Sequence, residues 1–259
     1  MTHVWRALGT HLGLDLGAMP EISVHAEAPI GSGLSSSTSL TIALTQACLN
    51  SIGCRQFSRG ELIRFSYEVE KSMTNGGGMD HVSIVDGGVV YLQGSEDDVP
   101  KTLGRGFWPQ DVGIILIDSG VEKSCADHIA ITRQKWQNGD TSLREYARLT
   151  EGVADTVWNI LKKGDSEALY SSIDTAHDLM RDFQGMSTPV LEKIRDVALT
   201  VGCRAVKLTG SGGGGCLFSL VPAVDVSRTL SDLEEAYNSL GYPVSVQSVK
   251  AAAPRTEEC

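Results

Sequence analysis

One stretch, residues 26–53, constrains the fold of this chain more than any other. An alternating apolar run ends at Pro29, and a loop of small residues, Gly31–Ser37, follows it. Apolar side chains then recur at helical spacing over residues 40–52 until a glycine ends the pattern. We therefore predict a strand over residues 21–28, then a tight loop, then a helix.

The loop of this stretch has the composition of an anion site. Glycine lets the backbone approach a ligand closely, and the hydroxyl-rich first turn leaves N–H groups free at the positive end of the helix dipole. The loop is not a Walker A motif, because no lysine follows its last glycine, and Ser36 replaces the third glycine of a dinucleotide fingerprint. Taken alone, it is either a phosphate loop or an ordinary strand–helix turn.

Two further stretches are rich in glycine. Residues 74–81 contain Asp80 near their end and follow shortly after the acidic pair Glu68 and Glu70. Residues 210–215 separate two short apolar runs. Each could be a solvated turn or a flexible connection by itself. Together, two glycine loops and carboxylate oxygens are the parts that Mg²⁺-assisted phosphoryl transfer needs.

The charge and cysteine content narrow the class of protein. The net charge of −10 argues against nucleic acid or an anionic membrane as a partner, since both favour basic surfaces. The six cysteines form no C-x-x-C pair and the six histidines show no zinc-ligand spacing, so we expect reduced thiols and no structural zinc. We find no signal peptide and no apolar run of transmembrane length, and we expect a cytoplasmic protein.

The remaining patterns mix helices and strands. We expect a capping box at Ser58–Glu61, and a cap at Thr188 with proline at the first helical position. Residues 95–106 are polar and read as a loop. Helices are expected from residue 2 to about residue 17 and at 142–163, 166–182, 189–201 and 225–241, and strands at 89–92, 112–117, 205–209, 216–221 and 244–250. Two adjacent strands joined by a glycine turn favour an α+β fold over a doubly wound sheet.

Three motifs in this order resemble the GHMP kinases, the superfamily of galactokinase, homoserine kinase, mevalonate kinase and phosphomevalonate kinase. PIGSGLSSST is similar to the phosphate motif of the family, NGGGMD to its glycine–Asp turn, and KLTGSGGGGC to its C-terminal glycine motif. The resemblance implies a two-lobed α+β fold. Residues 1–108 would form a ribosomal S5 domain 2-like, ATP-binding lobe, and residues 109–259 a ferredoxin-like C-terminal lobe.

The resemblance also implies roles for individual residues. Asp80 would be the catalytic base or orient the substrate hydroxyl, and Ser37 with Glu68 would hold Mg²⁺, Glu70 being the alternative. The ATP phosphates would be wrapped by the first loop: Pro29, Gly31, Ser32, Gly33, Leu34, Ser35, Ser36, Ser37 and Thr38. The acceptor pocket would be shaped by residues of the other glycine stretches and one lysine: Gly77, Gly78, Lys123, Gly210, Ser211, Gly212, Gly213 and Gly214.

The implied activity is transfer of the γ-phosphoryl group of MgATP to a small-molecule alcohol. KLTGSGGGGC and the paired glycine after Asp80 favour the mevalonate kinase branch, whereas GLSSS and GGGMD favour galactokinase. The alternatives are a galactokinase-type sugar kinase and a GHMP-fold protein that binds ligand without turnover. The family carries an N-terminal strand region ahead of the first loop that this chain lacks, so we expect a truncated or divergent short form. Apart from ATP and the alcohol, a homodimer is the one partner left open.

Overall fold

The computed structural model describes residues 1–26, 32–54, 57–72, 77–95, 98–122 and 125–255 of the 259-residue chain. The chain folds into two compact units. Unit 1 comprises residues 1–29, 35–107 and 252–259, and unit 2 comprises residues 30–34 and 108–251. The division is more than one cut near residue 108, because a short piece of the first loop groups with unit 2 and the C-terminal tail groups with unit 1.

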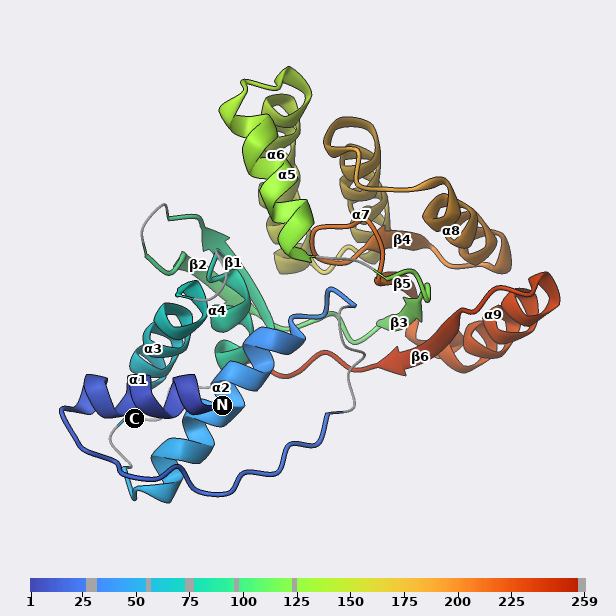
Figure 1. Cartoon of the computed structure of the whole chain (residues 1–259). Coiled ribbons are helices and arrows are strands. Elements are labelled where there is room, and N and C mark those ends of the chain that lie inside the picture. The colour runs from blue at the N-terminus through green and yellow to red at the C-terminus, as the bar shows by residue number, and fades with distance from the viewer. Residues whose placement is uncertain (27–31, 55–56, 73–76, 96–97, 123–124, 256–259) are drawn as a thin grey trace. The chain divides into compact units, whose positions relative to one another are not determined.

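The described part of unit 1 contains helices and one antiparallel strand pair (Figure 1). Its elements are α1 (Thr2–Leu12), α2 (Ser36–Ser51), α3 (Arg59–Lys71), α4 (Met79–Asp86), β1 (Val89–Gln93) and β2 (Lys101–Gly106). Trp5 and Leu8 of α1 pack with Leu44 of α2 and Phe65 of α3 in one apolar cluster. The packing of this cluster places the start of α2 beside the end of α3, where the candidate site lies.

The tail of the chain is bound to the end of α4. Asp86 is 2% exposed and accepts from Arg59 at 2.7 Å and from Arg105 at 2.8 Å. Its carbonyl also accepts from the amide of Arg255 at 2.7 Å. A buried carboxylate requires such partners, so Asp86 joins α3, α4, β2 and the tail within unit 1.

Several expectations for the first hundred residues need correction. Residues 21–26 form no strand, because an extended segment needs a neighbouring strand to pair its backbone groups and the described part of unit 1 offers only the β1–β2 pair. The first helix ends at Leu12 rather than near Gly17, since Gly13 adopts a left-handed conformation there (φ 66°). Residues 101–106, expected as loop, form β2. The capping box at Ser58 and Glu61 is confirmed.

Unit 2 is built on a four-stranded antiparallel sheet in the order β4-β5-β3-β6. Its strands are β3 (Val112–Asp118), β4 (Ala205–Leu208), β5 (Cys216–Pro222) and β6 (Ser245–Val249). Its helices are α5 (Cys125–Gln137), α6 (Thr141–Lys163), α7 (Ser166–Leu179), α8 (Pro189–Val201) and α9 (Val226–Leu240), with a π-helical turn at Met180–Gln184 and a 3₁₀ turn at Ala223–Asp225.

Helices cover both faces of this sheet (Figure 1). On one face, Leu191 and Ile194 of α8 and Leu233 of α9 pack against the strands in the largest apolar cluster. On the other face, Leu169 and Tyr170 of α7 pack with partly buried side chains of α6. The strands expected in this half are confirmed within one or two residues, as is the Thr188 cap of α8. The whole is an α+β fold, as the sequence predicted.

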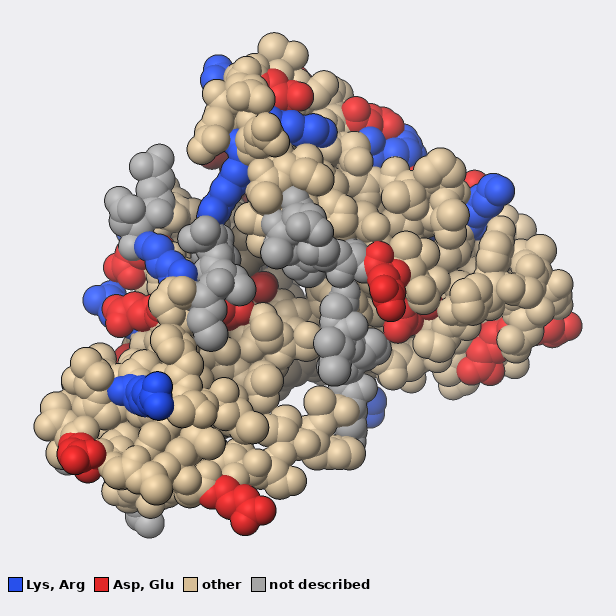
Figure 2. All heavy atoms as spheres, viewed as in Figure 1, with Lys and Arg blue, Asp and Glu red and all other residues tan. Residues whose placement is uncertain are grey.

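The surface and the helices add two observations. On the face drawn in Figure 2, lysine and arginine side chains are interspersed with acidic ones, and the coloured residues form no continuous basic patch. Within the described ranges, the chain has no helix that combines the length and the hydropathy of a membrane span.

Candidate functional site

The N-terminus of α2 has no side-chain cap. Ser35, the N-cap residue, has a left-handed backbone (φ 56°), and among the described residues it is the one non-glycine with positive φ. An N-cap serine usually accepts a hydrogen bond from a backbone N–H group of the first turn. The side chain of Ser35 accepts none, which leaves these N–H groups without a side-chain cap. Unusual backbone of this kind concentrates at ligand sites, and the free N–H groups favour an anion.

The first turn of α2 is bonded to the end of α3 through Glu70. Ser37 donates from Oγ to Oε1 of Glu70 at 2.6 Å, and Thr38 donates from Oγ1 to Oε2 at 2.8 Å. Nε2 of His81, in α4, lies 3.0 Å from Oε2 of the same carboxylate. The residue that meets Ser37 is therefore Glu70 and not Glu68, which is exposed on α3. Helix positions two apart face different ways, and here the buried position is 70.

The environment of Glu70 keeps its carboxylate charged. Burial on its own would raise the pKa, but the neighbouring His81 ring and the hydrogen bonds from Ser37 and Thr38 outweigh burial and lower the pKa of Glu70 from 4.5 to about 2. An ionised carboxylate beside a serine hydroxyl offers hard oxygen donors at the start of a helix. Such donors suit Mg²⁺.

Asp80 lies in the first turn of α4 and is half-buried. The helix begins at Gly78, whose φ of 76° places it in the left-handed region, and a Cβ there would lie 3.2 Å from the ring of Tyr67 and 3.0 Å from Pro100. Gly77 before it is exposed. Residues 77–80 thus lead into a helix that presents a carboxylate near its N-terminus.

In unit 2, the first loop is bonded to the third glycine stretch. Ser32 is 2% exposed, and its carbonyl accepts hydrogen bonds from the amide of Cys216 at 2.9 Å and from Oγ1 of Thr209 at 3.0 Å. Gly215 has φ 72°, and a Cβ on it would lie 2.5 Å from the carbonyl oxygen of Ser32. Two glycine-rich loops that are far apart in sequence are therefore in direct main-chain contact, and the Thr209–Ser32 bond joins residues 177 positions apart.

The residues that follow strand β3 also bind this glycine loop. The carbonyl of Gly215 accepts from Oγ of Ser119 at 2.6 Å, and its amide donates to the carbonyl of Val121 at 2.9 Å. Ser119 is 1% exposed. The sequence analysis did not single out Ser119 or Thr209, although a buried serine directly after a strand, in Asp118–Gly120, was a signal that could have drawn attention.

The middle of the glycine loop packs against α5 and the segment before α8. The amide of Gly213 donates to the carbonyl of Met186 at 2.6 Å, and a Cβ on Gly213 would lie 2.3 Å from the ring of His128. Gly212 and Gly214 are buried, whereas Gly210 is exposed and Ser211 is half-exposed. The loop has one conformation supported from several elements, which a flexible linker would not have.

The structure thus brings the predicted residues into two groups. Ser35, Ser36, Ser37 and Thr38 lie at the start of α2 in unit 1, and Ser32, Gly33 and Leu34 belong with the glycine loop in unit 2. Pro29, Gly31 and Lys123 lie outside the described residues. Sequence reasoning assigned no role to His81 and Met186.

The chain has a two-unit α+β fold with glycine-rich loops. Comparison with known proteins identifies its family. The family model described as GHMP kinases N terminal domain matches residues 1–88, and that described as GHMP kinases C terminal matches residues 156–241. The chain belongs to the GHMP kinase family.

Known proteins similar to this chain are kinases of the family. It is 26% identical over 216 residues to the mevalonate kinase of Pyrococcus horikoshii, covering 78% of this chain and 59% of that protein. It is 27% identical over 245 residues to the mevalonate kinase of Methanothermobacter thermautotrophicus, covering 93% and 78%. The chain thus spans about 59% of the length of the first of these relatives.

Solved structures show the same fold. The galactokinase of Lactococcus lactis, in complex with galactose, matches with a TM-score of 0.75 at 19% identity and covers 99% of this chain and 76% of its own. The mevalonate kinase of L. major, in complex with R-mevalonate, matches with a TM-score of 0.73 at 19% identity and covers 97% and 77%.

Proposed function

We propose that this chain is an ATP-dependent kinase that transfers the γ-phosphoryl group of MgATP to an alcohol of a small molecule, and that the alcohol is mevalonate. The observation that carries the proposal is the open N-terminus of α2 with Ser37 bonded to an ionised Glu70. Membership of the GHMP kinase family and the names of the similar proteins support it. We extend the proposal to a cytoplasmic protein, monomeric or homodimeric.

The residues present fit Mg²⁺. Ser37 and Glu70 offer a hydroxyl and a carboxylate, which are oxygen donors of the kind that Mg²⁺ prefers. When bound with ATP, Mg²⁺ neutralises charge on the transferred phosphoryl group. Glu70 is ionised well below neutral pH, so it can act as a ligand without losing a proton at the moment of binding.

The remaining steps fall to the chain's own groups. In unit 1, the N–H groups at the start of α2 would bind phosphate oxygens. In unit 2, the same role would fall to those amides of the Gly210–Gly215 loop that do not already donate to the carbonyls of Thr209, Met186 and Val121. Asp80 would accept a hydrogen bond from the hydroxyl of the acceptor and orient it for attack. Most of the rate enhancement would come from positioning and charge stabilisation, because phosphoryl transfer requires little covalent participation by the protein.

The choice of acceptor rests on sequence similarity. The KLTGSGGGGC motif and the mevalonate kinase relatives favour mevalonate. The GLSSS and GGGMD motifs favour a sugar, so a galactokinase-type activity is the second candidate.

The test is ATP consumption by the purified chain with Mg²⁺ and with mevalonate, galactose or homoserine offered separately. We expect turnover with mevalonate above the rate without acceptor. Turnover with galactose alone would replace the proposed acceptor, and ATP binding without turnover on any of the three would identify a binding protein in place of an enzyme.

A further inference from the structure

The glycine loop is supported by a segment that the proposed chemistry does not use. Met186 is 5% exposed, and its carbonyl accepts from the amide of Gly213 at 2.6 Å. A Cβ added to Gly212 would lie 2.7 Å from the Cβ of Met186. The main chain at Met186 therefore determines where the middle of the loop lies.

Met186 sits in a short irregular stretch between the π-helical turn and α8. Its amide donates to the carbonyl of Met180 at 3.1 Å, which attaches it to the start of that turn. The next residue, Ser187, donates from Oγ to Oε1 of Glu192. π-Helical turns recur at functional sites, and here the turn leads directly into the support of the loop.

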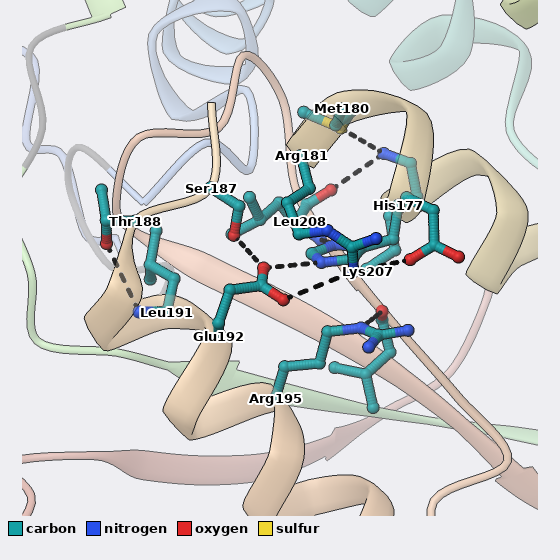
Figure 3. A network of polar contacts seen from close by, with 12 residues as sticks. His177, Met180, Arg181, Ser187, Thr188, Leu191, Glu192, Arg195, Lys207 and Leu208 are labelled. Carbon is teal, nitrogen blue, oxygen red and sulfur yellow. Dashed lines mark hydrogen bonds and ion pairs between the residues drawn. The ribbon is translucent and has the colours of Figure 1, made fainter. Parts of the chain in front are cut away.

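Glu192, in the first turn of α8, is the point where these contacts meet. Figure 3 shows its carboxylate facing Ser187, His177 and Arg181. Nε2 of His177 lies 2.9 Å from Oε1, and a guanidinium nitrogen of Arg181 lies 3.7 Å from Oε2. Burial alone would raise the pKa of Glu192, but the hydrogen bonds from Ser187 and His177 outweigh it and lower the pKa, so the carboxylate stays charged.

His177 connects the same carboxylate to the strand that enters the loop. The ring is fully buried, and Nδ1 accepts from the amide of Leu208, the last residue of β4, at 3.4 Å. Because Nδ1 accepts, the proton of the neutral ring is on Nε2, which donates to Glu192. Glu192 is therefore connected to the strand that enters the loop through the side chain of His177. It is connected to Met186, the segment under the middle of the loop, through the neighbouring Ser187.

A simpler role for Glu192 would be to stabilise the start of α8. That helix already has its cap, because Oγ1 of Thr188 accepts from the amide of Leu191 at 3.4 Å and Pro189 stands at its first position. The carboxylate of Glu192 points instead to side chains outside α8. Its contacts are those of a group that ties neighbouring segments together.

We propose that Glu192 is a positioning residue that sets the conformation of the Gly210–Gly215 loop by holding Ser187 on one side and His177 on the other. The catalytic consequence rests on the proposed function, in which this loop donates to the reacting phosphate the N–H groups that it does not already give to the carbonyls of Thr209, Met186 and Val121. Such groups stabilise charge only when they are already in place. A loosened loop lowers kcat while the affinity for ATP at the start of α2 is retained.

The test compares Glu192→Ala and Glu192→Gln with Asp196→Asn, an exposed acidic position on the same helix. The first readout is hydrogen exchange of the peptide spanning residues 208–216, measured by mass spectrometry. We expect faster exchange in Glu192→Ala, a smaller increase in Glu192→Gln, which keeps an acceptor for Ser187, and none in Asp196→Asn. Unchanged exchange in Glu192→Ala would overturn the proposal.

The second readout is steady-state kinetics, which separates this proposal from the proposed function. We expect kcat to fall about tenfold in Glu192→Ala, with a small change in the KM for ATP. This is less than the roughly 100- to 1,000-fold cost of removing a preorganised donor outright, because the donors are loosened and not removed. If Glu192→Ala does not fold, the graded response of Glu192→Gln decides the question. If the unsubstituted chain shows no kinase activity but Glu192→Ala exchanges faster in the loop, the positioning role is supported and the proposed kinase activity is refuted. If Glu192→Ala keeps full activity and unchanged loop exchange, the kinase activity is supported and the positioning role is refuted.

Discussion

The hydroxyl of Ser37 donates a 2.6 Å hydrogen bond to Oε1 of Glu70, so two residues 33 positions apart share one site at the start of α2. We predict that Ser37→Ala weakens Mg²⁺-dependent ATP binding by about 10- to 100-fold, the value of a lost charge-assisted contact. Isothermal titration with and without Mg²⁺ measures the change. Ser51→Ala, at the other end of the same helix, is the control, and equal affinities for the two variants would remove Ser37 from the site.

Asp80 is predicted to act on the acceptor and not on the nucleotide. In Asp80→Asn, we expect kcat to fall by about 100-fold or more, as for the loss of a general base, while ATP binding persists. Asp98→Asn changes an exposed carboxylate of the same unit and should retain activity. Full turnover in Asp80→Asn would exclude the assigned role.

Gly215 tests the contact between the two glycine loops. Gly215 and Gly164 both have φ near 70°, so an alanine at either position carries a left-handed penalty of about 1–2 kcal/mol. A Cβ at residue 164 meets nothing within 4 Å, whereas at residue 215 it meets the carbonyl oxygen of Ser32 at 2.5 Å. Urea unfolding should show a further loss of about 1–3 kcal/mol for Gly215→Ala, as overpacking produces. Equal losses in the two variants would contradict the close approach.

His177 makes stability depend on pH. Burial, followed by the charge of Arg195, lowers the pKa of His177 from 6.5, so the folded chain binds this proton less readily than the unfolded chain does. The stabilisation is therefore complete above pH 6.5 and is lost as the pH falls from 6.5 through the lower folded-state value. We expect the free energy of unfolding to decline as the pH falls over that window. His177→Gln should make this decline with pH less steep. A control, His25→Gln, changes an exposed histidine and should keep it.

Much of the fold could be predicted because local signals agreed with it. The capping box at Ser58, the proline after Thr188 and the apolar runs around the last glycine loop each define an element through neighbouring residues. Residues 21–26 failed because alternation predicts a strand only where another strand is present to pair with it. β2 was missed because its partner, β1, and not its own polar sequence, makes it a strand.

The structure brings some of the predicted site residues together, and it does so partly through contacts that spacing along the sequence does not show. Glycine and serine runs indicated where backbone could meet phosphate, and the structure places Ser35 to Thr38 at an open helix start. Spacing along α3 could not distinguish Glu68 from Glu70, because the choice depends on which side of the helix packs against α2. The supports of the glycine loop at Ser119, Met186 and Glu192 arise from tertiary contacts and left little trace in the sequence.

The most direct test of the central claim is phosphorus NMR of the purified chain with ATP, Mg²⁺ and mevalonate, with Asp80→Asn as the blank. The account predicts that a phosphomonoester signal of phosphorylated mevalonate grows as the γ-phosphate signal of ATP declines, and that Asp80→Asn shows neither change. ATP that is hydrolysed to inorganic phosphate without a new phosphomonoester, or that stays intact while bound, would contradict it.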